Sequence, residues 1–307
     1  MTLFWIVLLL GILITLYSIF YLFPQPFFNF ALRAQYKQAG LAKKTTEIDG
    51  HEIAYLVGGE GPPLVLLHGF GADKNHWPQA VRNLTNHFTV YAPDLPGFGE
   101  SSQLNSARYT GFDQVERVRA FVESLHLGKI HIGGNSMGGY IAGLYANRYK
   151  EDVESLWLLA PAGVLSAERS ELMELLDTGE NALLIDGPDA YDRLVDLCFS
   201  RAPYVPGPFK RCIYAKSVED RQFHEKLFAD MIADPQPLEE LLAGSTIPTL
   251  IVWGDEDRVL HPSGASFLAA AMANAKVQIM RSMGHLPMLE RPVETEFLYM
   301  DFHQLNK

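Results

Sequence analysis

The feature that most limits how this chain can fold is an uncharged apolar run near its N-terminus. No charged side chain precedes Arg33, and residues 3–23 are interrupted only by the small or weakly polar residues Gly11, Thr15 and Ser18. At ~1.5 Å rise per residue, a helix over this run spans about 30 Å, which matches the hydrocarbon core of a bilayer. Backbone groups find no hydrogen-bond partners in lipid, so such a run crosses a membrane as a helix. We therefore expect residues 1–23 to form a transmembrane helix.

A cleaved signal peptide is the alternative interpretation of this run. Signal peptides carry a basic segment before a shorter apolar stretch, and small residues at the cleavage site. Here no Lys or Arg precedes the run, which ends in aromatic residues and a proline. These differences favour an anchor that stays on the protein. Its stripe of Gly11, Thr15 and Ser18 would let two helices approach closely, so a homodimer through the transmembrane helix is a further hypothesis.

Residues 24–45 form a juxtamembrane segment with an amphipathic pattern. One helical face can hold the apolar residues Phe27, Phe28, Ala31, Leu32 and Tyr36. That face suits either a helix lying at the membrane surface or a connecting helix packed on the rest of the protein. Residues 1–45 hold four basic residues and no acidic one, out of 25 basic and 36 acidic in the whole chain. A basic collar attracts anionic lipid headgroups, and the acidic remainder argues against a nucleic-acid partner.

From residue 46 onward, short apolar runs alternate with helical patterns. The runs with the plainest strand character lie at residues 63–67, 88–94, 129–134, 154–160, 248–254 and 276–280. A turn signal at Asp49 and Gly50 also predicts a short hairpin before them. Strands that alternate with helices predict an α/β fold, in which a mostly parallel sheet is covered by helices on both faces.

The alternation stops over residues 161–245, which show helical periodicity but no convincing strand. We expect these residues to form a helical cap, or lid, over the carboxyl ends of the strands, where α/β folds place their sites. The catalytic core would then consist of residues 46–160 and 246–307. Composition agrees with a folded core, because 48% of the residues are hydrophobic and two cysteines are too few for a disulfide scaffold.

One of the expected strands runs directly into a serine motif. Residues 134–138 read GNSMG, which fits the pattern G-x-S-x-G in the strand–turn–helix setting of a nucleophilic serine. The glycines have a steric cause, because side chains two residues either side of so sharp a turn would collide. Ser136 is therefore the candidate nucleophile.

A serine hydroxyl needs a base to remove its proton, and the base needs an acid to orient it. His285 follows the last expected strand and is preceded by a glycine, so it is the candidate base. The loop after the preceding strand offers three acids, of which we choose Asp257 because it lies deepest in the loop, with Asp255 as the runner-up. Asp94 precedes Ser136, which breaks the chain order serine, acid, histidine, and is expected to hold its own loop.

The developing oxyanion needs two N–H donors. One belongs to Met137, the residue after the nucleophile, at the start of a helix. The other is expected from Phe70 in the HGFG segment at residues 68–71, where His68 is expected to brace the loop. No cofactor or metal is expected, because the glycine-rich segments lack a dinucleotide fingerprint and no His, Asp or Glu residues have metal-ligand spacing.

Five motifs together resemble the α/β-hydrolase superfamily. They are HGFG at 68–71, DLPGFGES at 94–101, GNSMGG at 134–139, WGDEDRVLHP at 253–262 and GHLPMLERP at 284–292. With its anchor, the chain is similar to bacterial family V lipases and to mammalian membrane-anchored monoacylglycerol lipases. The resemblance implies hydrolysis of acyl esters in membrane phospholipids, lysolipids or acylglycerols, with a fatty acid as product. It also implies a triad of Ser136, Asp257 and His285, with Phe70 and Met137 at the oxyanion hole.

Carbon–carbon bond hydrolases of ring-fission products are the alternative within that superfamily. They share GNSMGG but lack an anchor, and a Trp usually follows their catalytic histidine where this chain has Leu286. A tethered binding protein on an inactive hydrolase fold is a third interpretation. The resemblance further implies a single-pass protein of the inner (cytoplasmic) membrane. The positive-inside rule places the catalytic domain in the cytoplasm, whereas long domains can cross regardless of flanking charge, so both orientations stay open.

Overall fold

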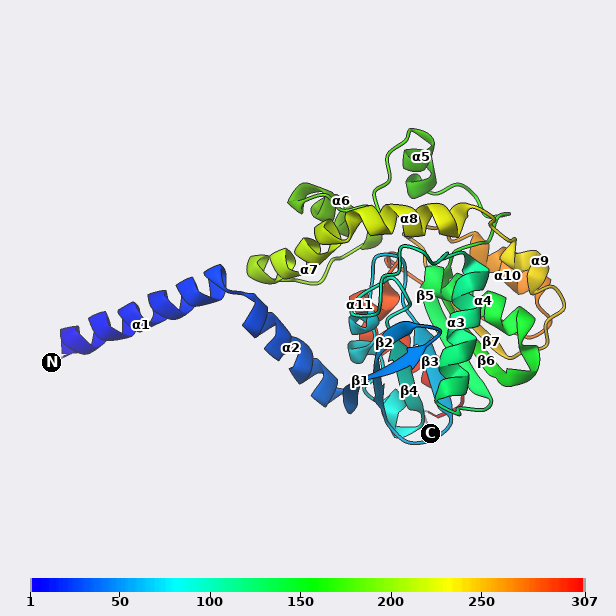
Figure 1. The fold of residues 1–307 in the computed structure, drawn as a ribbon, viewed down its shortest axis with the longest axis horizontal. Helices are drawn as coiled ribbons and strands as arrows, with labels where there is room; N and C mark the ends of the chain where they lie inside the picture. Colours follow the sequence, from blue (N-terminus) through cyan, green and yellow to red (C-terminus); the bar gives the residue numbers. More distant parts are fainter. Residues whose placement is uncertain (1, 306–307) are drawn as a thin grey trace.

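The computed structural model describes residues 2–305, and its first two helices lie outside the folded body. Helix α1 (Thr2–Leu22) projects away from the rest of the chain, and α2 (Gln25–Gln38) connects it to the sheet (Figure 1). Pro24 stands between them, where it removes a backbone donor and separates the two helices. Among the described residues, Leu3–Leu22 is the one helical stretch long and apolar enough to cross a membrane.

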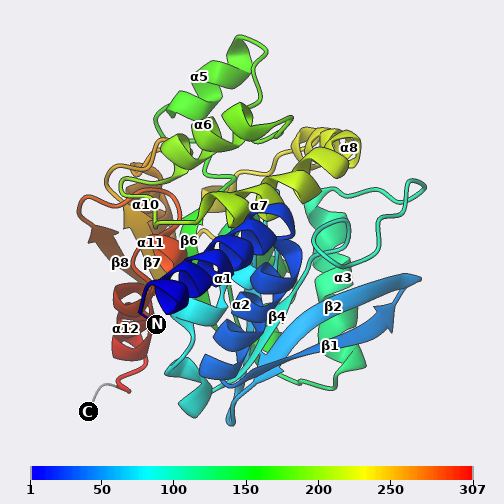
Figure 2. The same ribbon diagram turned by 90° about the vertical axis from the view of Figure 1, so that its left-hand side faces the viewer.

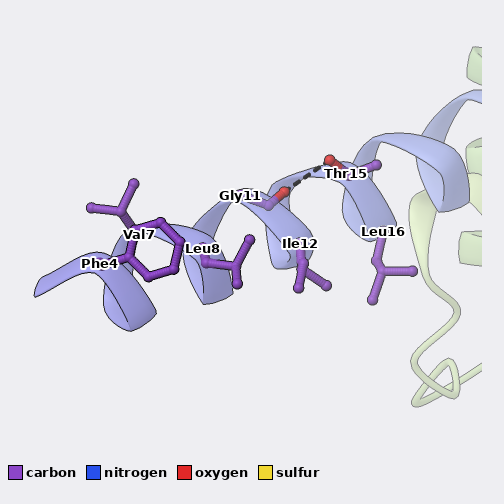
Figure 3. Close-up of a pocket in the computed structure, with 7 residues that line it drawn as sticks. All are labelled: Phe4, Val7, Leu8, Gly11, Ile12, Thr15 and Leu16. Carbon is purple, nitrogen blue, oxygen red and sulfur yellow. Dashed lines mark hydrogen bonds between the residues drawn. The ribbon is translucent and has the colours of Figure 1, made fainter. Parts of the chain in front are cut away.

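The side chains of α1 are almost all exposed, as they would be on a helix surrounded by lipid. Figure 3 shows a hollow along one side of the helix, lined by apolar residues around Gly11 and Thr15. The Thr15 hydroxyl donates a hydrogen bond of 2.8 Å to the carbonyl of Gly11, one turn earlier. That hydroxyl donor is therefore already used within the helix.

Helix α2 packs on the body through one face. Phe28 and Tyr36 are half-buried on that face, whereas Phe30 is exposed. The Phe28 ring lies 5.5 Å from the ring of Phe209, and the Tyr36 hydroxyl hydrogen-bonds the side chain of Asn75. The helix therefore contacts two separate segments of the body through this face.

The body is built on one sheet with the strand order β1-β2-β4-β3-β5-β6-β7-β8. The strands are β1 (Leu41–Ile48), β2 (His51–Gly58), β3 (Pro63–Leu67), β4 (Thr89–Pro93), β5 (Ile130–Ser136), β6 (Val153–Pro161), β7 (Thr249–Gly254) and β8 (Ala275–Met280). The pairs β1–β2 and β2–β4 are antiparallel and the other neighbours are parallel, so the predicted mostly parallel sheet is confirmed. The predicted hairpin turn falls at Asp49 and Gly50, whose φ angles are 47° and 75°.

Apolar side chains fill both faces of the sheet, because alternate residues of a strand point to opposite sides. On one face, residues such as Val65 and Ile132 pack with α3 (Gly111–Ser124), α4 (Met137–Arg148) and α10 (Gly264–Ala271). On the other, residues such as Leu64 and Trp157 pack with α11 (Pro287–Glu290), α12 (Pro292–Phe302) and the short turns η2 (Pro78–Ala80) and η3 (Leu84–Asn86). The continuous apolar runs in the sequence are therefore strands covered on both faces.

Between β6 and β7 the chain is helical. It forms α5 (Glu171–Asp177), α6 (Pro188–Cys198), α7 (Gly207–Glu219), α8 (Arg221–Ile232) and α9 (Leu238–Leu241). Helices α5 to α8, here called the cap, lie together above the sheet (Figures 1 and 2). The cap contacts loops at the carboxyl edge of the sheet: Leu172 donates to the carbonyl of Arg258 at 3.1 Å, and His224 and Phe228 pack on Phe70. Helix α9 instead packs into the core beside α4.

Helix α7 of the cap also touches both N-terminal helices. Its Phe209 ring lies 5.4 Å from the ring of Phe20 in α1 and 5.5 Å from that of Phe28 in α2. Its Arg211 hydrogen-bonds the carbonyl of Tyr21, with the guanidinium 4.9 Å from the centre of the tyrosine ring. The two N-terminal helices are therefore in direct contact with the cap.

Candidate active site

Ser136 ends strand β5, directly before helix α4. Its φ is 56°, in a region that residues other than glycine rarely adopt, so the turn holds it in a strained conformation. Gly134 and Gly138 leave no space beside the turn. A Cβ added to Gly134 would lie 2.3 Å from the carbonyl carbon of Gly138. A Cβ added to Gly138 would lie 2.2 Å from the carbonyl oxygen of Leu67. This is the strand–turn–helix geometry that the serine motif predicts.

Asp257 and His285 lie side by side in the loops that follow β7 and β8. The Nδ1 atom of His285 is 2.8 Å from Oδ2 of Asp257, and both side chains are buried. The other carboxylate oxygen accepts hydrogen bonds of 2.9 Å from the amides of Val259 and Leu260. Asp255, the runner-up, is exposed. The fixed carboxylate favours the tautomer that carries its proton on Nδ1, which leaves Nε2 able to accept one.

Asn135 joins the serine turn to the histidine loop. Its side-chain amide donates hydrogen bonds to the carbonyl of His285 at 3.0 Å and to that of Leu159 at 3.1 Å. In residues 2–305 no hydrogen bond links the Ser136 hydroxyl to His285, and such bonds often form only once substrate is bound. Asn135 was not among the predicted site residues. Its partner is a backbone carbonyl 150 positions along the chain, which no sequence pattern reveals.

The predicted oxyanion donors come from two segments that meet at Ser136. A Cβ added to Gly69 would lie 3.3 Å from the Cβ of Ser136, so the loop after β3 lies directly against the nucleophile. Met137 is the first residue of α4. Across the described part of the chain, the amides of Phe70 and Met137 have no hydrogen-bond partner. Both therefore remain available to an oxygen atom bound beside Ser136.

His68 braces the loop that carries Phe70, as the sequence predicts. Its Nε2 accepts a hydrogen bond from the amide of Leu95 at 2.9 Å, and its Nδ1 lies 2.8 Å from the carbonyl of Gly69. Burial lowers the pKa of His68 to about 4, so the ring is neutral at pH 7. In that state Nδ1 donates and Nε2 accepts, which satisfies both contacts.

A buried ion pair between Lys74 and Asp94 joins the loop after β3 to the loop after β4. Asp94 accepts hydrogen bonds from the Lys74 ammonium and amide, both 2.6 Å, and from the amide of Glu100 at 2.8 Å. Burial alone would lower the pKa of Lys74, but the carboxylates of Asp94 and Glu100 raise it above its ordinary value. Asp94 thus holds its own loop, as expected, whereas its partner Lys74 could not be predicted from any motif.

The two glycine-rich segments that lack a dinucleotide fingerprint, residues 58–61 and 97–99, use their glycines for packing. A Cβ at Gly99 would lie 2.4 Å from the carboxyl group of Asp94, and one at Gly59 would lie 2.2 Å from the carbonyl oxygen of Phe88. Neither segment opens a helix with a free N-terminus for a phosphate group. Among residues 2–305, no group of three or more His, Cys, Asp or Glu side chains could hold a metal ion.

Comparison with known proteins agrees with this geometry. The sequence model of the α/β hydrolase fold family matches residues 62–292. Lipase 1 of Psychrobacter immobilis is 33% identical over 267 residues, which cover 86% of this chain and 84% of that protein. Monoacylglycerol lipase ABHD6 of Mus musculus is 32% identical over 255 residues, with 80% of this chain and 76% of that protein covered.

A solved structure resembles nearly the whole chain. The crystal structure of a membrane phospholipase A, described as a bacterial virulence factor, superposes with a TM-score of 0.90 at 40% identity. The match covers 99% of this chain and 98% of that one. This similarity and the apolar helix α1 together point to a membrane-anchored protein. From the matched motifs, the sheet and its relatives, we conclude that the chain belongs to the α/β hydrolase fold family.

Proposed function

We propose that the protein is a membrane-anchored serine carboxylic-ester hydrolase that cleaves acyl esters of membrane lipids. Its substrates are phospholipids, lysolipids or acylglycerols. The observation that carries the proposal is the buried Asp257–His285 pair, which Asn135 links to the strained turn of Ser136. Lipases and a membrane phospholipase A among the similar proteins support the ester class.

The reaction begins with attack of the Ser136 hydroxyl oxygen on the ester carbonyl carbon. The hydroxyl proton passes to Nε2 of His285, and Asp257 stabilises the imidazolium that results. The carbonyl oxygen becomes an oxyanion, which accepts hydrogen bonds from the amides of Phe70 and Met137. The ester C–O bond then breaks, and His285 gives its proton to the departing alcohol oxygen. The products of this half are a lysolipid or glycerol species and an acyl group bonded to Ser136.

Water completes the cycle by the same route in reverse. His285 takes a proton from a water molecule, whose oxygen attacks the acyl carbon and forms a second tetrahedral intermediate. That intermediate collapses, the bond to Ser136 breaks, and His285 returns the proton to the serine oxygen. The fatty acid leaves, and the enzyme is restored without a cofactor taking part.

The anchor brings the site to its substrate. We propose that α1 crosses the inner (cytoplasmic) membrane once and that the cap regulates access of lipid to Ser136. The contacts of Phe209 with Phe20 and Phe28 hold the cap at the membrane-facing end of the body. Tethering replaces a search through solution by a high local concentration of lipid. Recovery of the full-length protein in the soluble fraction after cell lysis would contradict this placement.

A homodimer through α1 is a finer proposal, supported by the hollow around Gly11 (Figure 3). Small residues let transmembrane helices approach closely, and a bulky residue at Gly11 would fill the hollow. Gly11→Leu should therefore reduce cross-linking between copies in membranes. Equal cross-linking of the wild type and the variant would remove this interface.

The proposed function is tested by measuring activity on a panel of substrates, with the wild type and with a variant that lacks the Ser136 hydroxyl. Purified enzyme is incubated with a phospholipid, a lysophospholipid, a monoacylglycerol and a ring-fission dienoate, and the products are identified. We expect release of fatty acid from at least one lipid, and a loss of about 10⁶-fold in kcat in Ser136→Ala, because the nucleophile cannot be replaced. Preferred turnover of the dienoate would favour the carbon–carbon hydrolase, and full esterase activity of Ser136→Ala would defeat the catalytic assignment.

A further inference from the structure

The carboxylate of Glu290 joins two segments that lie far apart in the chain. Its Oε2 accepts hydrogen bonds of 3.2 Å from the amides of Gly284 and Ser200, and its Oε1 accepts one of 2.8 Å from the amide of Arg201. Gly284 belongs to the loop that carries His285, here called the histidine loop. Ser200 and Arg201 belong to the segment that leaves cap helix α6. One side chain therefore holds the histidine loop and the cap together.

The same two segments also touch through their backbones. The amide of His285 donates a hydrogen bond of 2.7 Å to the carbonyl of Cys198. A Cβ added to Gly284 would lie 2.4 Å from that carbonyl oxygen and 2.8 Å from the amide nitrogen of Ser200, so the segments pack without room for a side chain. Glu290 therefore binds the histidine loop and the cap segment, and these two are also bonded directly to each other through His285 and Cys198. A shift of the cap segment must move the backbone of His285.

The neighbouring Arg291 holds the histidine loop in a different way. Its guanidinium donates hydrogen bonds to the carbonyls of Arg281 at 2.8 Å and of Ser282 at 2.7 Å, at the start of the loop. It also pairs with Glu294 at 3.3 Å, on the exposed side of α12. Arg291 thus fixes the loop to the core, whereas the bonds of Glu290 extend from the loop to the cap.

We propose that Glu290 is a positioning residue for His285, which it fixes by binding the histidine loop and the cap segment 198–201 at once. The inference rests on the proposed function, because that function assigns the base to His285. An ionised carboxylate suits this place, since both of its oxygens only accept hydrogen bonds and charge-assisted bonds are the stronger ones. A carboxamide has one acceptor oxygen, and its NH₂ group would face an amide N–H instead of accepting from it. The position of the cap segment and the position of His285 therefore depend on the same side chain.

Two substitutions separate the reach of the side chain from its charge. Glu290→Gln keeps the size but removes the charge and one acceptor oxygen, whereas Glu290→Asp keeps the charge and shortens the reach. Glu151→Gln is the matched control, because Glu151 is exposed and lies in the turn η4 (Lys150–Asp152), outside both segments that Glu290 joins. All variants are measured as full-length protein in detergent with a water-soluble short-chain ester, so that membrane binding does not enter the rates.

Both Glu290 variants should lower kcat by roughly 10- to 100-fold with little change in KM, since a misplacement of about 1 Å costs about 10²-fold in rate. The low-field proton NMR signal of the His285–Asp257 hydrogen bond should weaken. Glu151→Gln should match the wild type in kcat, in KM and in the NMR signal.

A merely structural role would appear differently and would overturn the inference. In that case the melting temperature falls while kcat and the low-field NMR signal stay at their wild-type values. Wild-type kcat in Glu290→Asp would also overturn it, because the effect of Glu290→Gln would then come from charge alone. Should Glu290→Gln not fold, Glu290→Asp carries the test.

Ser136→Ala, measured in the same assay, keeps this inference separate from the proposed function. If Ser136→Ala is inactive and the Glu290 variants behave like the wild type, only the positioning role fails. If Ser136→Ala retains full activity, the proposed function itself fails. The two failures are therefore distinguishable.

Discussion

Ser136 is held at its strained φ by atoms on both sides of the turn. The glycines at 134 and 138 bring the backbone of β5, the start of α4 and the end of β3 within contact distance of one another. The first turn of α4 therefore begins at a fixed place, which also fixes the direction of the Met137 amide. Strain of this kind persists only where the surrounding structure over-determines it, and it is typical of functional sites.

Gly138→Ala should test this packing at the level of a single methyl group. The new Cβ would lie 2.2 Å from the carbonyl oxygen of Leu67, so the turn must move. We expect kcat to fall by about 10²-fold, because the nucleophile and the amide of Met137 move together. Gly187→Ala is the control, since a Cβ at Gly187 meets no atom within 4 Å. Equal kcat in the two variants would show that the turn tolerates displacement.

Residues that occupy a fixed place in a sequence motif could be predicted from the sequence. Residues whose side chains bind backbone groups of distant segments could not. Ser136, Asp257 and His285 follow strand ends that are visible as apolar runs, and the structure brings Asp257 and His285 into contact. Asn135 and Glu290 bind backbone carbonyls and amides of distant segments. Such partners have no sequence signature, because every residue carries the same backbone groups.

The end of helix α12 is joined to the sheet by a cluster of rings and one hydroxyl. The rings of His131 in β5 and His303 after α12 lie 5.0 Å apart, and both pack on Phe88. The Ser155 hydroxyl lies 2.8 Å from His131 Nδ1 and 3.4 Å from His303 Nε2. Burial lowers the pKa of both histidines, that of His303 to about 4, although Glu154 near His131 opposes the effect there.

This cluster should make the stability of the protein depend on pH. A histidine with a lowered pKa takes up its proton more readily in the unfolded chain, so acid favours unfolding. The contribution is present above the ordinary histidine pKa of about 6.5 and is lost as pH falls toward 4. We expect the free energy of unfolding, measured by chemical denaturation in detergent, to fall less steeply over this window in His303→Phe. Parallel curves for the variant and the wild type would contradict this account.

Single elements could be predicted closely, whereas their neighbours in space could not. The expected strands at residues 63–67 and 276–280 correspond to Pro63–Leu67 and Ala275–Met280. The order of the strands places β4 between β2 and β3, although β3 precedes β4 in the chain. Local periodicity reports which residues are buried, but the pairing of strands depends on contacts across the whole fold.

At the scale of the whole molecule, a continuous series of contacts joins the anchor to the cap, and the cap to the loops that carry Asp257 and His285. Phe20, in the last turn of the anchor helix α1, packs on Phe209 of the cap. The cap in turn contacts the histidine loop through Glu290. It contacts the loop that carries Asp257 through Arg258, whose guanidinium pairs with Glu171 at 2.6 Å. The sequence predicted an apolar anchor, a basic collar and an acidic body as separate regions. Their contacts with one another depend on tertiary packing, which composition does not describe.

The central claim is that Ser136 carries the acyl group of a membrane lipid during turnover. The most direct measurement is mass spectrometry of the Ser136 peptide, after rapid mixing with a phospholipid whose two acyl chains differ in mass and an acid quench. We predict a transient mass increase equal to one of the two acyl groups on that peptide, and none on the corresponding peptide of Ser136→Ala. Release of fatty acid without any acylation of Ser136 would contradict the account.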